Sequence, residues 1–192
     1  MVEKCAFTIM VVGAKGGVGA TTFVANLAVQ LATQGHVLAI DADLNGMSDL
    51  SHTLGMIDEA KGLKEAKYNL KLTQELFRSY LGSGLNGVGL LNLSGDGLNL
   101  LEEFIDDLSS CYSFIVVDCG DASESHLEQF FSISSRLILL TVPDHSSTRA
   151  SEKKFKYFDR KEIRPGAIDL VMNRLDEGRS LESPPVSWLR RL

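Results

Sequence analysis

The sequence has few cysteines and no apolar stretch long enough to cross a membrane. Its three cysteines, Cys5, Cys111 and Cys119, form no C-x-x-C pair, which favours reduced thiols in a cytoplasm over a disulfide framework. No window approaches the roughly 18 apolar residues of a spanning helix. The short apolar run near the N-terminus has no signal-peptide cleavage pattern. The sequence therefore predicts a cytoplasmic protein.

The chain also lacks an excess of positive charge and a cluster of histidines. Its formal net charge of −6 argues against a dedicated nucleic-acid-binding protein, although a local basic face stays compatible with it. None of the four histidines pairs with a cysteine or carboxylate at metal-ligand spacing. Apolar residues, in contrast, are plentiful. They make up 44% of the 192 residues, enough for one domain with a full-sized core.

Short apolar segments alternate with helix-like segments along most of the chain. The apolar segments are rich in Val, Ile and Leu on both faces, as in parallel strands that are covered on two sides. This alternation predicts an α/β fold with a doubly wound, mostly parallel sheet and helices on both faces. The predicted strands are Phe7–Gly13, Val37–Asp41, Gly89–Leu93, Phe114–Asp118, Leu137–Val142 and Ala167–Met172. The predicted helices are Thr21–Gln34, Asp49–Ala66, Thr73–Leu81, Leu98–Ser109, Ser123–Ser134 and Ser146–Lys161.

The domain organisation is predicted to be simple, with one domain over residues 1–183 and a short tail over residues 184–192. The glycines of Gly82–Gly97 flank the third predicted strand and are interpreted as turns and a mobile loop. Ligands of such sheets bind beyond the carboxyl ends of the strands. The candidate site therefore comprises the loop after Gly13 and the polar or loop residues at later strand ends, namely Asp41, Asp118, Pro143 and Asn173.

The sharpest motif joins the first predicted strand to the first predicted helix and reads G-A-K-G-G-V-G-A-T-T from Gly13. Its glycines let the backbone wrap closely around an anion, and a helix N-terminus follows, as in a phosphate-binding P-loop. Thr21 is expected to face a phosphate-bound Mg²⁺, and Thr22 an inner phosphate. The lysine that usually precedes the first threonine is replaced by Ala20, so Lys15 is the only lysine in the loop.

This loop resembles the deviant Walker A motif of the ParA/MinD family of P-loop ATPases, whose usual form is K-G-G-x-G-K-[ST]. The resemblance covers about residues 5–175 and implies ATP and Mg²⁺ as ligands. It implies that Lys15 is the signature lysine, which takes part in catalysis by reaching across a sandwich dimer to the partner's nucleotide. The residues implied to surround the phosphates are Gly16, Gly17, Val18, Gly19, Ala20, Thr21 and Thr22.

The missing second lysine sets this loop apart from the usual family pattern. Because Ala20 removes a cation from the phosphates, we expect weaker ATP affinity, slower hydrolysis, or both. A related set of loops, G-G-x-G-A-T-T, belongs to the CpaE/TadZ branch, which helps position pilus-assembly machinery. The loop sequence of this chain is closest to that branch.

Two carboxylate segments follow later strands. Asp41-Ala42-Asp43 resembles the family's switch I, which implies that Asp43 orients or activates the attacking water and that Asp41 supports the Mg²⁺ shell. Asp118 ends an apolar strand, the form of a Walker B strand whose carboxylate serves Mg²⁺ through water. The alternative for the first two aspartates is capping of the next segment. A calcium loop fits poorly, because the twelfth residue is His52 and a strand precedes.

Two further segments match family positions. Cys119-Gly120-Asp121 replaces the frequent x-P-x of switch II, so Gly120 can supply a flexible N–H near the γ-phosphate. We interpret Cys119 as a packing residue, with a reactive thiol as the alternative. Asn173 and Arg174 resemble the N-R that follows a late strand. This implies that Asn173 contacts adenine, while Arg174 packs over the base or pairs with a carboxylate.

Two surfaces are candidates for partners other than nucleotide. Glu152–Arg164 contains six basic residues with aromatic residues between them, so it is either a weak, nonspecific DNA face or a solvated helix with its aromatic side chains turned inward. The tail at Trp188–Leu192 is either a peripheral membrane contact at the inner face of the membrane or a frayed C-terminus.

Three functions remain open on the sequence. The first is a nucleotide-dependent switch that forms a homodimer through ATP and positions a pilus or cell-envelope machine by way of a protein partner, with weak ATP hydrolysis. The second is a competent partition or septum-site ATPase. The third is a scaffold that binds partners without nucleotide. Ala20 favours the first or third function, whereas Lys15, Thr21, Asp43 and Asp118 favour the first or second.

Overall fold

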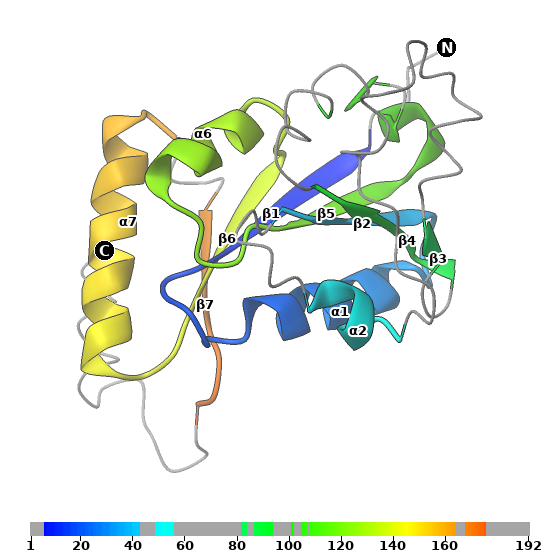
Figure 1. The fold of residues 1–192 in the computed structure, drawn as a ribbon. Helices are drawn as coiled ribbons and strands as arrows, with labels where there is room; N and C mark the ends of the chain where they lie inside the picture. The colour runs from blue at the N-terminus through cyan, green and yellow to red at the C-terminus, as the bar shows by residue number, and fades with distance from the viewer. Residues whose placement is uncertain are drawn as a thin grey trace.

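The protein is built around a seven-stranded sheet in the order β3-β4-β2-β5-β1-β6-β7 (Figure 1). The computed structural model describes residues 6–42, 49–55, 82–83, 87–93, 101, 105–106, 108–163 and 168–175. The strands are β1 (Phe7–Gly13), β2 (Val37–Asp41), β3 (Gly82–Ser83), β4 (Gly89–Asn92), β5 (Phe114–Asp118), β6 (Arg136–Thr141) and β7 (Ile168–Met172). All neighbouring pairs are parallel except β3 and β4.

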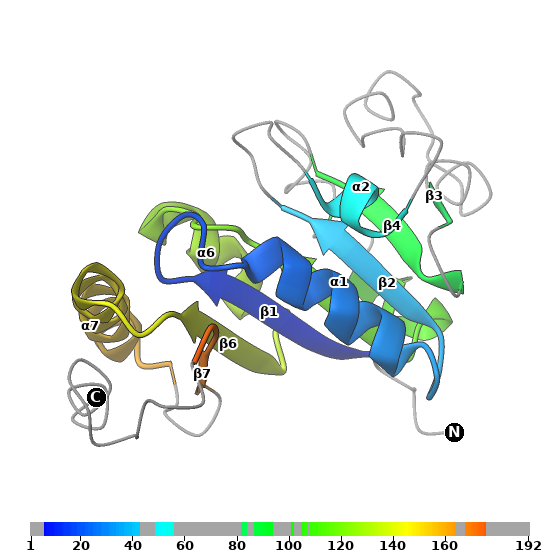
Figure 2. The same cartoon turned by 90° about the horizontal axis from the view of Figure 1, so that it is seen from below.

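Helices cover both faces of the sheet. The helices that lie wholly within the described residues are α1 (Ala20–Leu31), α2 (Leu50–Thr53), α6 (Glu124–Phe131) and α7 (His145–Arg160). α1 and α2 lie on one face, and α6 and α7 lie on the other (Figure 1). Seen from below, α1 runs along the sheet beside β1 and β2 (Figure 2). The predicted three-layer α/β/α fold is therefore confirmed.

Alternation along β1 divides the interior into two cores. Met10 and Val12 face a core that includes Phe158 of α7, whereas Ile9 and Val11 face a core that includes Val24 of α1. Successive side chains of a strand point to opposite faces. A strand that is buried on both faces therefore needs an unbroken run of apolar residues. Full burial of a residue such as Phe158 stabilises the fold by roughly 1.5–3 kcal/mol.

Most predicted strand boundaries agree with the structure to within one residue, and those of β1, β2 and β5 agree at both ends. The helical prediction for Asp49–Ala66 is wrong at Leu54 and Gly55, because Gly55 has a φ of 66° and its N–H donates to the His52 carbonyl, which ends α2 at Thr53. Residues 56–66 of that prediction lie outside the described residues. The loop prediction for Gly82–Gly97 is wrong at Gly82–Ser83, which pairs with β4. The helix predicted at Thr73–Leu81 lies outside the described residues.

Candidate functional site

The loop between β1 and α1 has the conformation that its glycines predict. Gly17 has a φ of 75° and Gly19 a φ of 94°. Residues other than glycine rarely adopt this backbone conformation. Gly19 is also confined, because a Cβ there would lie 2.7 Å from the Nδ2 atom of Asn173. Both the backbone conformation and the space therefore require glycine at position 19.

Two hydrogen bonds fix the start of this loop to neighbouring strands. The Gly13 N–H donates to the Gly120 carbonyl at 2.7 Å, and the Ala14 N–H donates to the Leu140 carbonyl at 2.8 Å. The loop is thus held between the carboxyl ends of β5 and β6, the strands on either side of β1. This is the edge of the sheet where ligands of doubly wound folds bind.

The N-terminus of α1 is open to an anion. Gly19 provides no side-chain cap, and the first turn contains no acidic residue. The first N–H groups of a helix have no intrahelical acceptor, and together with the helix dipole they attract negative charge. Thr21 and Thr22 lie in this first turn, whereas Ala20 is 8% exposed and packs into the core. The arrangement suits a phosphate group bound by backbone amides and hydroxyls.

Two predicted metal-site carboxylates lie side by side at the ends of β2 and β5. Asp41 and Asp118 are partners in the strand register and are 2% and 1% exposed. The Asp118 Oδ1 atom accepts the Gly120 N–H at 2.9 Å. Carboxylate and hydroxyl oxygens are the ligands that Mg²⁺ prefers, so the side chains of Asp41, Asp118 and Thr21 have the chemistry that the predicted Mg²⁺ site requires. Asp43, the predicted water-activating residue, lies outside the described residues.

The Lys15 side chain forms an ion pair within its own chain, at the start of α7. Its Nζ atom lies 3.0 and 3.3 Å from the two carboxylate oxygens of Asp144 and also donates to the Ser146 hydroxyl. Asp144 is the N-cap of α7 and accepts the Ser147 N–H at 2.7 Å. That backbone hydrogen bond, with help from Ser146 and Lys15, holds the Asp144 pKa well below its usual range against the opposing effect of burial.

The two residues predicted to contact the base also lie at this edge. The Asn173 Nδ2 atom donates to the Val18 carbonyl at 2.9 Å, and its Oδ1 atom accepts the Arg174 N–H at 2.9 Å. Asn173 therefore fastens the end of β7 to the phosphate loop, a contact that its sequence position did not predict. An amide has two N–H groups and two lone pairs, so Asn173 retains capacity for a base. Arg174 is exposed and has a φ of 53°.

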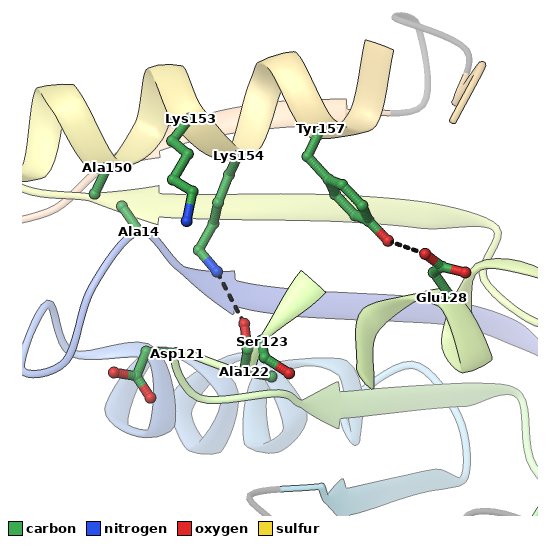
Figure 3. Close-up of a pocket in the computed structure, with 9 residues that line it drawn as sticks. All are labelled: Ala14, Asp121, Ala122, Ser123, Glu128, Ala150, Lys153, Lys154 and Tyr157. Atoms are coloured by element: carbon green, nitrogen blue, oxygen red, sulfur yellow. Dashed lines mark hydrogen bonds between the residues drawn. The ribbon is translucent and has the colours of Figure 1, made fainter. Parts of the chain in front are cut away.

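The loop after β5 is hydrogen-bonded both to the start of the phosphate loop and to α7. Lys154 of α7 is 8% exposed, and its Nζ atom donates to the Ala122 carbonyl at 3.0 Å. A cavity of about 640 Å³ opens between this loop, α6 and α7 (Figure 3). Cys119, the first residue of this loop, is buried, and burial, followed by the nearby Asp118 charge, raises the pKa of its thiol. This agrees with the interpretation of Cys119 as a packing residue.

The basic segment on α7 turns its aromatic side chains inward. Tyr157 and Phe158 are buried, and Phe155 packs against the same core. The Tyr157 hydroxyl donates to Glu128 at 2.7 Å. The expectation of a solvated helix with inward aromatic residues is therefore confirmed for the described part.

No described helix is both long and apolar enough to span a membrane.

Three residues of this edge were not assigned from the sequence: Asp144, Lys154 and Asp121. Asp144 could have been found as an N-cap, because it immediately precedes H-S-S at the start of a predicted helix. Asp121 was noted only as a departure from the x-P-x pattern, and its Oδ2 atom lies beside Gly16. Nothing in the sequence marked Lys154 as a buried lysine.

Comparisons with known proteins agree with this geometry. The sequence profile described as "CobQ/CobB/MinD/ParA nucleotide binding domain" matches residues 9–156. A putative septum site-determining protein MinD from Emiliania huxleyi is 28% identical over 176 residues, which are 87% of this chain and 62% of that protein. The chain thus spans less than two thirds of the length of this relative.

Solved structures show the same fold. A ParA family ATPase from Chlorobium tepidum superposes with a TM-score of 0.81 at 22% identity, over 97% of this chain and 80% of its own. The septum site-determining protein MinD from Pyrococcus horikoshii, solved in complex with Mg-ADP, has a TM-score of 0.72 at 26% identity. That match covers 97% of this chain and 76% of the other.

Proposed function

The chain belongs to the CobQ/CobB/MinD/ParA nucleotide-binding domain family, and on this basis we propose that it is an ATP-dependent dimerising switch with weak hydrolytic activity. The phosphate loop carries the proposal. Its glycines and the open N-terminus of α1 suit a phosphate, whereas Ala20 leaves the loop without the usual second lysine. Binding of ATP then matters more than its turnover.

Each residue of the site has a proposed role. The amides of Gly16–Ala20 and the hydroxyls of Thr21 and Thr22 hold the phosphates, and Asn173 with Arg174 holds the base. Thr21, Asp41 and Asp118 hold Mg²⁺, which when bound offsets phosphate charge. Asp43 positions the attacking water. Lys15 leaves Asp144 and reaches the nucleotide of a second copy.

The proposed cargo is a cellular machine at the envelope. The loop sequence G-G-V-G-A-T-T supports the CpaE/TadZ branch, and hence pilus assembly, with a protein partner of a localisation or secretion machine. We propose one nucleotide-binding domain over residues 1–183 that works in the cytoplasm. For the tail at 184–192, a peripheral membrane contact is the less favoured alternative to a frayed C-terminus. A nonspecific DNA contact through α7 is the less favoured alternative.

The competing functions make different demands on the same site. Similarity to septum site-determining proteins supports a competent partition or septum-site ATPase, which requires ordinary turnover despite Ala20. A scaffold of the same fold requires no nucleotide binding. Measured affinity and turnover therefore separate the three functions.

Calorimetric titration with Mg-ATP tests the proposal. We expect saturable binding by the wild-type chain and a marked loss of affinity in Thr21→Val, which removes the hydroxyl but keeps the shape. Thr33→Val is the matched control, because Thr33 follows the far end of α1. Absence of binding in the wild type would support the scaffold and overturn the proposal.

A further inference from the structure

One carboxylate beside the phosphate loop has no role in the function described above. Asp121 is exposed, and its Oδ2 atom would lie 3.3 Å from a Cβ placed on Gly16. Figure 3 shows this carboxylate directed away from Lys153 and Lys154 of α7. The Asp121 carboxylate thus lies beside Gly16, one of the glycines that are proposed to receive the phosphates.

The backbone around Asp121 is held from both sides. Gly120 has a φ of 52°, donates its N–H to Asp118 at 2.9 Å and accepts the Gly13 N–H at 2.7 Å. On the other side, Lys154 donates to the Ala122 carbonyl at 3.0 Å. The position of the Asp121 backbone is therefore fixed relative to the loop, and only rotation of the side chain can move its charge.

The charges around the loop are unevenly distributed. Lys15 is the cation of the loop, and Asp144 pairs with it at 3.0 Å. Ala20 contributes no charge, while Asp41, Asp118 and Asp121 all lie at this edge. A metal-free triphosphate that enters such a loop is repelled by these carboxylates. A divalent cation carried with the nucleotide reverses that repulsion, because it is a large local positive charge.

We propose that Asp121, placed against Gly16 in a loop that lacks a lysine at position 20, makes the phosphate loop select nucleoside triphosphate in its Mg²⁺ complex over the metal-free nucleotide. The proposal rests on the proposed nucleotide-binding function and names the form of the ligand that the loop accepts. Asp41 and Asp118 are buried and belong to the proposed metal shell. Asp121 differs from them, since it is exposed and faces the loop.

Calorimetric titrations of ATP, in excess Mg²⁺ and in EDTA, test this selection with three proteins. These are the wild type, Asp121→Asn, and Asp159→Asn as a control that makes the same substitution at an exposed position near the C-terminal end of α7. Circular dichroism checks that each variant is folded. If Asp121→Asn is not folded, Asp121→Ser takes its place. We expect Mg²⁺ removal to weaken wild-type binding by roughly tenfold or more. Asp121→Asn should tighten metal-free binding by roughly fivefold or more, and Asp159→Asn should leave the ratio unchanged.

Each result has a defined meaning. An unchanged affinity of Asp121→Asn for metal-free ATP overturns the inference and leaves the proposed function intact. A variant that only loses affinity for Mg-ATP also overturns it, because Asp121 would then act in the metal shell. If no protein binds Mg-ATP, the proposed function fails, and the inference fails with it.

Discussion

The Nζ atom of Lys15 lies 3.0 Å from the Oδ2 atom of Asp144, at the N-terminus of α7 in the same chain. The side chains are 38% and 45% exposed, so the ion pair is weak, as is usual at a surface. Because the ion pair is weak, Lys15 can exchange the Asp144 carboxylate for another anion. To reach the nucleotide of a second copy, Lys15 must therefore first leave Asp144, its partner in the same chain.

Replacement of Asp144 by serine should make ATP-dependent dimerisation easier. Serine caps a helix about as well as aspartate, so α7 is retained while Lys15 loses its carboxylate partner. We expect the ATP concentration for half-maximal dimerisation to fall by up to about fivefold, since an exposed pair is worth at most about 1 kcal/mol. Light scattering across an ATP titration measures this. A concentration equal to or higher than that of the wild type would show that the pair does not oppose dimerisation.

The same residue predicts how stability depends on pH. The pKa of Asp144 is lowered from 3.8, chiefly by the hydrogen bond from the Ser147 N–H. A lowered folded-state pKa contributes stability that is fully present above the unfolded value and is lost as the pH falls through the folded value. Asp144→Ala should therefore cost about 1 kcal/mol near neutral pH. That cost should shrink below about pH 4.

Urea unfolding of both proteins between about pH 3 and pH 7 measures this cost. Asp169→Ala is a useful comparison, because Asp169 pairs with Arg136 at 2.7 Å and caps no helix. A cost for Asp144→Ala that stays constant as the pH falls would contradict the assigned cause.

Two glycines of the phosphate loop should differ in their sensitivity to alanine. Both have positive φ, but a Cβ at Gly17 meets nothing within 4 Å, whereas one at Gly19 lies 2.7 Å from Asn173. Gly17→Ala should lower the free energy of unfolding by about 1–2 kcal/mol through backbone strain alone. Gly19→Ala should cost more, roughly 2–4 kcal/mol, because it also displaces the Asn173 side chain. Equal losses in urea unfolding would contradict the contact.

Restoration of the missing lysine should increase ATP turnover. Ala20→Lys places an ammonium beside the proposed phosphates, and a preorganised charge of this kind should raise turnover by roughly tenfold or more. Ala20→Met is the control, because it has similar length without charge and tests the burial of position 20. Phosphate release measures both. Ordinary turnover in the wild type with no gain in Ala20→Lys would refute the argument from charge.

Much of the fold was predictable because its strands are buried on both faces. Runs such as Phe114–Asp118 therefore carry a strong apolar signal, and their boundaries agree with the structure. Gly82–Ser83 was missed because two residues with no apolar pattern become a strand only by pairing with β4. The end of α2 at Thr53 was missed because helical periodicity does not reveal the left-handed backbone of Gly55.

The candidate site was predictable where the chemistry is local. The glycines of the loop and the strand-end positions of Asp41 and Asp118 follow from the motif and from the sheet. The Lys15–Asp144 pair joins residues 129 positions apart, and it depends on β6 lying beside β1. The contact of Asn173 with Val18 depends in the same way on where β7 joins the sheet. Such contacts require the order of the strands, which no local pattern supplies.

The proposed function requires that ATP drive two copies of this chain together through Lys15. Multi-angle light scattering in Mg²⁺, with and without ATP, measures this directly for the wild type and for Lys15→Gln, which keeps a polar side chain but removes the charge. We expect ATP to convert the wild-type chain from monomer to dimer and to leave Lys15→Gln monomeric. A wild-type mass that does not change at saturating ATP, or a Lys15→Gln variant that dimerises as well as the wild type, would contradict the account.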